Sequence, residues 1–193
     1  MKSMKALVDK IRNEGKAIGT EIVKVDGFIN HQLDVAFMEQ LGREFSWKFD
    51  GEEVDLILTV ESSGIAIACA TAPFFSYAPV VFAKKSVPVS MVEGYYHADT
   101  HSATTGKTTT LVVSKKFINE DNKVLILDDF LSHGESARAL ASIVKDAGAE
   151  LVGIGVVIEK GFLNGGKILR DMGYRVESLA VIDHIEDGEI EFR

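Results

Sequence analysis

The sequence has very little cysteine and no long apolar run. A single cysteine, Cys69, in 193 residues excludes an internal disulfide framework and an all-cysteine metal site. It also favours a reducing compartment, so we expect a cytoplasmic protein. No apolar run reaches the ~18 residues that a membrane-spanning helix needs, and the first residues lack the apolar core of a signal peptide. The 29 Asp and Glu outnumber the 21 Lys and Arg, and the resulting net charge of -8 disfavours nucleic acid and anionic membranes as partners.

The residues that are present predict an α/β fold. Hydrophobic residues make up 46% of the chain, enough for one domain with a sizeable core. Continuous β-branched and apolar runs, typical of strands buried on both faces, lie at 54–60, 79–82, 123–130, 151–161 and, as the last strand, 175–185. Helical patterns lie between them at 35–49 after the N-cap Asp34, 62–75, 136–148 and 167–172. This alternation predicts a central, mainly parallel sheet flanked by helices.

One polar segment, 86–107, interrupts the alternation. We expect it to be a long loop, either a lid over a binding site or a disordered surface insertion. His97, Asp99 and His101 alternate within it and would share one face if the segment were a strand. We interpret them as solvated side chains rather than metal ligands. We expect Cys69, in an apolar helix, to be a small buried hydrophobe.

The run VLILDDFLSHGES (124–136) carries the strongest candidate site. Asp128 and Asp129 fall at the carboxyl end of a predicted central strand, where open α/β sheets bind ligands. The polar turn at 132–136 leads into a helix, so backbone amides, hydroxyls and the helix dipole can bind a phosphate, and Gly134 allows close approach. Paired carboxylates suit a sugar diol, or Mg²⁺ held beside a substrate phosphate. The alternative is an acidic strand end followed by a capped helix.

Three standard motifs are incomplete. TTGKT (104–108) resembles the end of a phosphate-binding P-loop, but its first glycine is missing and a strand pattern follows it. Gly153 and Gly155 begin a dinucleotide fingerprint that has Ile158 in place of its third glycine. No G-x-S-x-G elbow is present. Kinase, dehydrogenase and serine-hydrolase functions are therefore disfavoured.

The 124–136 run resembles the signature by which type I phosphoribosyltransferases bind 5-phosphoribosyl-1-diphosphate (PRPP). Four apolar residues, two acids, two more residues and a small phosphate turn follow in the same order. Agreement with the bacterial xanthine branch of this family extends over nearly the whole chain, through 22–34 (IVKVDGFINHQLD), 60–66 (VESSGIA), 153–162 (GIGVVIEKGF) and 172–180 (MGYRVESLA). The resemblance implies the fold of that family, with a small hood formed by about 1–33 and the C-terminal strand, and a flexible lid at about 86–107.

The resemblance also implies roles for individual residues. Asp128 and Asp129 would hold the ribose hydroxyls of PRPP at the catalytic centre. The other PRPP contacts would be Ser132, His133, Gly134, Glu135 and Ser136 at the 5′-phosphate, and Glu61, Ser62, Ser63, Gly64 and Lys84 at the diphosphate. Xanthine would be bound by Val23, Asn30, Lys160 and Phe162. Lys160 would donate to the exocyclic oxygen, which favours 6-oxopurines over adenine.

The implied reaction is displacement of diphosphate from C1 of PRPP by N9 of the purine. Mg²⁺ would bind with PRPP rather than directly to the protein, and a homodimer is implied. Ser132 stands where many hypoxanthine-guanine enzymes have Asp, and a serine hydroxyl cannot act as a general base at neutral pH. A guanine- or hypoxanthine-preferring enzyme is one alternative, and a PRPP-binding regulator without turnover is the other. The acidic charge, and a first strand pattern beginning near Ile18, disfavour a DNA-binding regulator.

Overall fold

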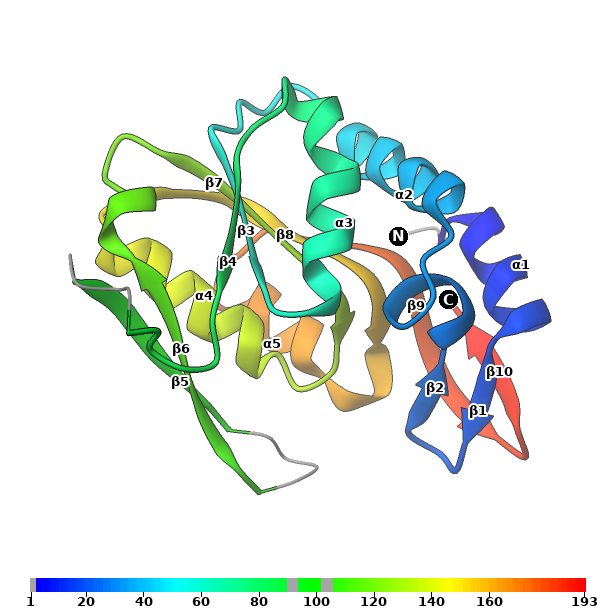
Figure 1. Ribbon diagram of the computed structural model, residues 1–193. Helices are drawn as coiled ribbons and strands as arrows, with labels where there is room; N and C mark the ends of the chain where they lie inside the picture. The colour runs from blue at the N-terminus through cyan, green and yellow to red at the C-terminus, as the bar shows by residue number, and fades with distance from the viewer. Residues whose placement is uncertain (1–2, 90–93, 102–105) are drawn as a thin grey trace.

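A six-stranded sheet forms the centre of the protein (Figure 1). The computed structural model describes residues 3–89, 94–101 and 106–193. The strands, in spatial order, are β10 (Glu189–Phe192), β9 (Val176–Glu186), β8 (Glu150–Lys160), β7 (Lys123–Leu131), β3 (Leu56–Val60) and β4 (Val80–Ala83). Only the pairing of β10 with β9 is antiparallel in this sheet. The predicted mainly parallel α/β fold is therefore confirmed.

Helices cover both faces of the sheet, as the apolar strand runs predict. The two faces are visible on β7, where Leu125 and Leu127 join one hydrophobic cluster and Val124 and Ile126 join the other. The first cluster includes residues of α1 (Lys5–Glu14), α2 (Val35–Lys48) and α3 (Ser63–Thr71). The second includes residues of α4 (Glu135–Asp146) and α5 (Gly165–Asp171).

A charged contact joins the first two helices. Asp34 accepts a hydrogen bond from the Phe37 amide at 3.0 Å, so it caps α2 as predicted, and it also pairs with Lys10 Nζ at 2.9 Å. The same ammonium lies 5.2 Å from the Phe28 ring centroid and 5.1 Å from that of Phe37. These contacts anchor the N-terminal connection, which consists of β1 (Lys16–Ile18), β2 (Ile22–Lys24) and the π-helical turn η1 (Asp26–Asn30).

The prediction of a continuous loop at 86–107 is wrong in its middle. Strand β5 (Tyr95–His101) pairs antiparallel with β6 (Thr108–Ser114), and this hairpin packs against α4. Tyr96 and Ala98 alone carry the inward apolar pattern of β5, too few for the alternation to stand out in a polar sequence. Residues 90–93 and 102–105 of the expected lid lie outside the described residues.

Three smaller expectations are also corrected. Cys69 is exposed, because α3 buries Gly64, Ile67, Ala68 and Thr71 and leaves the cysteine off that face. The helix expected over 62–75 is confirmed only as far as Thr71, where α3 ends, and its last four residues form the 3-10 turn η2 (Ala72–Phe75), which has a proline in its first turn. Strand β10, short and alternating in charge and apolarity, follows the strand that was expected to be last. No helix in the described ranges is both long and apolar enough to cross a membrane.

Candidate active site at the carboxyl end of the sheet

A hollow lies where β7 ends, at the edge of the sheet that also holds the end of β8. Parallel pairing sets Asp128 opposite Val156 and Leu131 opposite Glu159, so the polar residues that follow both strands come together. The hollow has a volume of about 210 Å³. Its lining is Thr100, His101, Asp128, Phe130, Leu131, Ser132, His133, Gly134, Glu135, Ser136, Ala137 and Val156. The first predicted carboxylate and the whole predicted phosphate turn therefore surround one space.

Asp128 is a buried carboxylate beside a second one. Burial, followed by the neighbouring charge of Asp129, raises the pKa of Asp128 well above its ordinary value. Its Oδ1 accepts a hydrogen bond from the Asp129 amide at 2.9 Å, while Asp129 Oδ1 accepts one from the Phe130 amide at 2.9 Å. A buried carboxylate with so few donors is costly to ionise, and hydroxyl groups of a ligand would offset that cost.

Replacing Asp128 with Asn is expected to stabilise the free protein at neutral pH. A folded pKa above the unfolded one makes the protein lose stability as the pH rises from the unfolded value through the folded value. An amide has no such ionisation. Thermal melts of both proteins from pH 4 to pH 8 should therefore show the variant melting higher by several degrees at pH 8, with the gap closing toward pH 4. A difference in melting temperature that is constant across pH, or that has the opposite sign, would contradict the raised pKa of Asp128.

The turn at 132–136 has the backbone geometry of an anion site. Gly134 has a φ of +81°, a conformation that glycine adopts without strain, and it precedes the first turn of α4. Amides at the start of a helix point outward toward bound anions. The Glu135 carboxylate, the one negative group in the turn, pairs with Arg138 on α4. This pairing reduces its repulsion of a phosphate.

The predicted diphosphate turn, 61–64, lies directly beside the carboxylates. Glu61 Oε1 accepts a hydrogen bond from the Lys85 amide at 2.7 Å, which ties the turn to the end of β4. A methyl group on Gly64 would stand 3.2 Å from Asp128 Oδ1 and in steric overlap with Thr59 Oγ1. That Thr59 hydroxyl is buried and has no hydrogen-bond partner among the described residues. Glycine is therefore required at 64 by close approach.

The two lysines after β4 take different positions. Lys84 Nζ lies 5.6 Å from the Phe82 ring centroid, and its backbone bridges to Val112 of β6. The positive charge of Lys85 instead acts to lower the pKa of Asp128, but the opposing effect of burial is larger. No described contact joins Lys84 to the carboxylates, so its predicted role at a diphosphate stays a prediction.

The predicted base contacts approach from two sides. Lys160, at the end of β8, is half-buried, and its Nζ lies 5.5 Å from the centroid of the Phe130 ring that lines the hollow. Burial lowers the pKa of Lys160, and the charge of Glu21 opposes that change. Phe162 follows in the 3-10 turn η4 (Gly161–Leu163).

From the other side, Asn30 Nδ2 approaches Asp129 Oδ2 at 3.5 Å. Asn30 therefore lies beside Asp129, although the two residues are 99 positions apart in the chain. Val23 is buried in β2 as part of the hydrophobic core. A base contact by Val23 stays a prediction.

Three residues near the site were not predicted from the sequence. Phe130 follows the two acids and lines the hollow, and Thr100 and His101 reach it from β5. An aromatic residue within the 124–136 run was the one available signal for Phe130. His97, Asp99 and His101 do share the exposed face of β5, and Asp99 accepts a hydrogen bond from Thr110 at 2.6 Å. Within the described ranges, no three His, Cys, Asp or Glu side chains gather as a metal site would require.

Comparison with known proteins agrees with this arrangement. The family model described as "Phosphoribosyl transferase domain" matches residues 34–184. A curated protein named xanthine phosphoribosyltransferase 1 from Clostridium perfringens is 50% identical over 98% of this chain and 100% of its own. One named xanthine phosphoribosyltransferase from Clostridioides difficile is 48% identical over the same shares.

A solved structure supports the fold. The crystal structure of adenine phosphoribosyltransferase from Rhodothermus marinus aligns with a TM-score of 0.73 and 19% identity, covering 92% of this chain and 99% of that one. At this identity the similarity concerns the fold alone. The family match instead spans the strand end with its two carboxylates, the glycine-containing turn at 61–64 and the phosphate turn. This chain therefore belongs to the phosphoribosyltransferase family.

Proposed function

We propose that the protein is a xanthine phosphoribosyltransferase, which converts xanthine and PRPP to xanthosine 5′-monophosphate and diphosphate in purine salvage. The observation that carries the proposal is the juxtaposition of the 132–136 turn with buried Asp128 in one hollow at the sheet edge. Full-length relatives at 48–50% identity that bear this name support the choice of base. A PRPP-binding regulator without turnover is the less favoured alternative.

In this proposal the 5′-phosphate sits on the amides at the start of α4. The ribose hydroxyls donate to Asp128 and Asp129, which places C1 of the ribose toward Lys160 and Phe162. The diphosphate lies along the 61–64 turn, where Gly64 leaves room beside Asp128. N9 of xanthine attacks C1 as the bond to diphosphate breaks, and the imidazole N–H proton of the base is released to solvent. The positive charge that develops on the ribose ring lies near the two carboxylates. Positioning then supplies most of the catalysis.

Magnesium is proposed to enter with the diphosphate of PRPP. The ion would be held mainly by oxygens of PRPP, and the carboxylates of Asp128 and Asp129 offer hard oxygen donors of the kind that it prefers. When bound, Mg²⁺ would neutralise charge on the leaving diphosphate. Removal of divalent cations with a chelator should then abolish turnover, and added Mg²⁺ should restore it.

Two finer assignments accompany the proposed reaction. Lys160 is proposed to donate to the 6-oxo group of the base and Asn30 to pair with its mixed edge. A homodimer is proposed because the family resemblance implies one, and the aromatic residues Phe74, Phe75 and Tyr77, of which Tyr77 is 78% exposed, could contribute to its interface. Light scattering should then give about twice the 21.1 kDa mass of one chain.

The test of the proposed function is a parallel assay of four bases. Purified protein with PRPP and Mg²⁺ is supplied with xanthine, guanine, hypoxanthine or adenine, and nucleotide formation is followed for each. We expect xanthine to give the highest kcat/KM and adenine the lowest. Preference for guanine or hypoxanthine would replace the proposed substrate with the alternative one. Binding of PRPP by calorimetry without turnover of any base would instead support the regulator.

Replacing Lys160 with Ala should weaken use of the base more than use of PRPP. Loss of one charged hydrogen-bond donor to an oxo group costs about 1.5–3 kcal/mol, so we expect KM for xanthine to rise by roughly 10- to 100-fold. The KM for PRPP should change by less than about threefold, since Lys160 lies outside the phosphate turn. Equal increases in both constants would assign Lys160 to the diphosphate or to the fold.

A further inference from the structure

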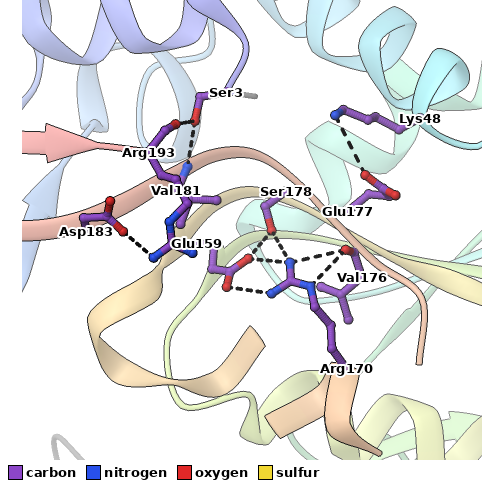
Figure 2. Close-up of polar contacts among 10 residues, drawn as sticks. All are labelled: Ser3, Lys48, Glu159, Arg170, Val176, Glu177, Ser178, Val181, Asp183 and Arg193. Carbon is purple, nitrogen blue, oxygen red and sulfur yellow. Dashed lines mark hydrogen bonds and ion pairs between the residues drawn. The ribbon is translucent and has the colours of Figure 1, made fainter. Parts of the chain in front are cut away.

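A buried ion pair between Glu159 and Arg170 (Figure 2) flanks the proposed base contacts Lys160 and Phe162 along the chain. Glu159 is the residue before Lys160 on β8, and its carboxylate is buried. Both of its oxygens are bound by Arg170 of α5, with Oε1 to Nη1 at 2.9 Å and Oε2 to Nη2 at 2.8 Å. The Ser178 hydroxyl of β9 also donates to Oε2. This is a bidentate, charge-assisted contact, the most directional kind of side-chain pair.

The Arg170 guanidinium connects three elements. Besides its contacts to Glu159 it donates from Nη2 to the Val176 carbonyl at 3.2 Å, at the start of β9. Burial alone would raise the pKa of Glu159, but hydrogen bonds from Arg170 and Ser178 outweigh it and lower the pKa below its ordinary value. One side chain therefore fixes the end of β8, the helix α5 and the first residue of β9 to one another.

The ion pair brackets the segment that carries the proposed base contacts. Glu159 and Arg170 stand at its two ends, with Lys160 and Phe162 between them. Further along, the Gly165 amide donates to the Ser132 carbonyl at 3.1 Å, so the same segment also contacts the phosphate turn.

This segment has little room to adjust. A methyl group on Gly165 would lie 2.7 Å from the Gly134 amide nitrogen, within the phosphate turn. A methyl group on Gly166 would lie 2.7 Å from Arg170 Nη1, against the ion pair. Two adjacent glycines thus allow the start of α5 to pack simultaneously against the phosphate turn and the buried charges. A shift of the pair would move the base contacts relative to the phosphate.

We propose that Glu159 and Arg170 are positioning residues that set the placement of Lys160 and Phe162 relative to the phosphate turn, and so the approach of N9 to C1. This inference rests on the proposed function, because it takes Lys160 and Phe162 as base contacts. Neither charged group lines the hollow, so each acts through its neighbours. Displacing a reacting group by about 1 Å is enough to slow an enzyme by roughly 100-fold, which makes a rigid support behind the base segment consequential.

The proposal differs from a purely structural role in a measurable way. A buried ion pair is often replaced by apolar side chains without loss of stability, because the charges no longer have to be desolvated. If the pair served stability alone, a well-folded apolar replacement would have ordinary kinetics. If it positions the base segment, a stable replacement loses use of the base while it keeps its affinity for PRPP.

Glu159→Gln is the principal test, because it keeps the shape and removes the charge. We expect KM for xanthine to rise about 10-fold and kcat to fall, while the Kd of PRPP measured by calorimetry without base changes by less than about twofold. Arg170→Lys, which keeps the charge but cannot bind both oxygens, is expected to show the same split. The exposed pair Lys167–Asp171 on the same helix supplies the control, and Asp171→Asn should leave both constants unchanged.

A triple variant covers the case in which the single variants fold poorly. Glu159→Met with Arg170→Met and Ser178→Ala removes all three polar groups, and it should melt cooperatively near the wild-type temperature. The same rise in KM for the base in this stable protein would support positioning. Normal constants in it, or an equal loss of base and PRPP binding, would overturn the proposal.

Lys160→Ala separates this inference from the proposed function. If Lys160→Ala raises KM for the preferred base and the ion-pair variants do not, the base assignment stands and the positioning role is refuted. If Lys160→Ala has no effect on that KM, the base assignment fails, and the positioning role fails with it.

Discussion

Replacing both Asp128 and Asp129 with Asn is expected to reduce kcat/KM for PRPP by about 1,000-fold. Each carboxylate that accepts a ribose hydroxyl contributes about 1.5–3 kcal/mol as a charged hydrogen-bond acceptor, and loss of both removes negative charge beside the developing positive charge on the ribose ring. The side chains keep nearly the same size, so the hollow keeps its shape. Steady-state kinetics with saturating xanthine and varied PRPP give the value directly.

The matched control for this pair is Asp183→Asn. Asp183 follows Ile182, the β9 residue paired with Lys160, so it is also near the carboxyl end of a strand, but it pairs with Arg193 and is not among the residues that line the hollow. Its replacement should leave kcat/KM for PRPP within about twofold, as is usual for an exposed ion pair. Activity above about a tenth of wild type in the Asp128/Asp129 double variant would remove these two residues from the catalytic centre.

The sheet could be predicted from the sequence because strands that are buried on both faces consist of nearly continuous apolar runs. The run 123–130 has four consecutive apolar residues at 124–127 before its two acids, and such an uninterrupted apolar stretch is typical of a strand covered by helices on both sides. The two carboxylates then had to lie at the edge where ligands bind. Asp34 was equally readable, since a helix start needs an acceptor for its free amides and the apolar spacing behind it sets the start within a residue or two.

The hairpin of β5 and β6 could not be predicted in the same way. Only one side of β5 is covered, and the apolar residues on that side are one tyrosine and one alanine. With so few apolar positions, the sequence shows no clear alternation and cannot be distinguished from that of a loop. The consequence reaches the site, because Thr100 and His101 line the hollow from this strand. A long polar segment was correctly singled out as unusual, yet its local pattern contains no information about where it packs.

Contacts at the site between residues far apart in the chain could not be predicted from local sequence patterns either. The approach of Asn30 to Asp129, and the binding of Glu159 by Arg170, depend on how separate elements stack rather than on spacing within one. Residue types signalled some of this chemistry, since an acid buried next to Lys160 in an apolar strand requires a partner. The sequence did not indicate which of 21 cations supplies it. Cys69 shows the reverse error, because a nearly uniform apolar helix does not reveal which of its faces is left uncovered.

Replacing Gly64 with Ala should reduce kcat/KM for PRPP by about 100-fold. The new methyl group would overlap Thr59 Oγ1 and stand 3.2 Å from Asp128 Oδ1, so the 61–64 turn or the carboxylate has to move. Thr59 is fully buried on β3, and a β-branched side chain has few alternative rotamers, so the strain falls on the turn. Overpacking of this kind also costs about 1–3 kcal/mol of stability, which a thermal melt would register as a lower Tm.

A second substitution identifies the contact that causes this loss. Thr59→Ala removes the atom that the Gly64→Ala methyl overlaps, so the double variant should recover at least about a tenth of wild-type kcat/KM, a non-additive result typical of residues in direct contact. Gly27→Ala is the control for adding a methyl group to a glycine, because nothing lies within 4 Å of that position. If Thr59→Ala fails to rescue Gly64→Ala, the close approach between β3 and the turn is not what makes glycine necessary there. Rescue would instead show that the buried threonine and the glycine together set the distance between the proposed diphosphate turn and the carboxylates.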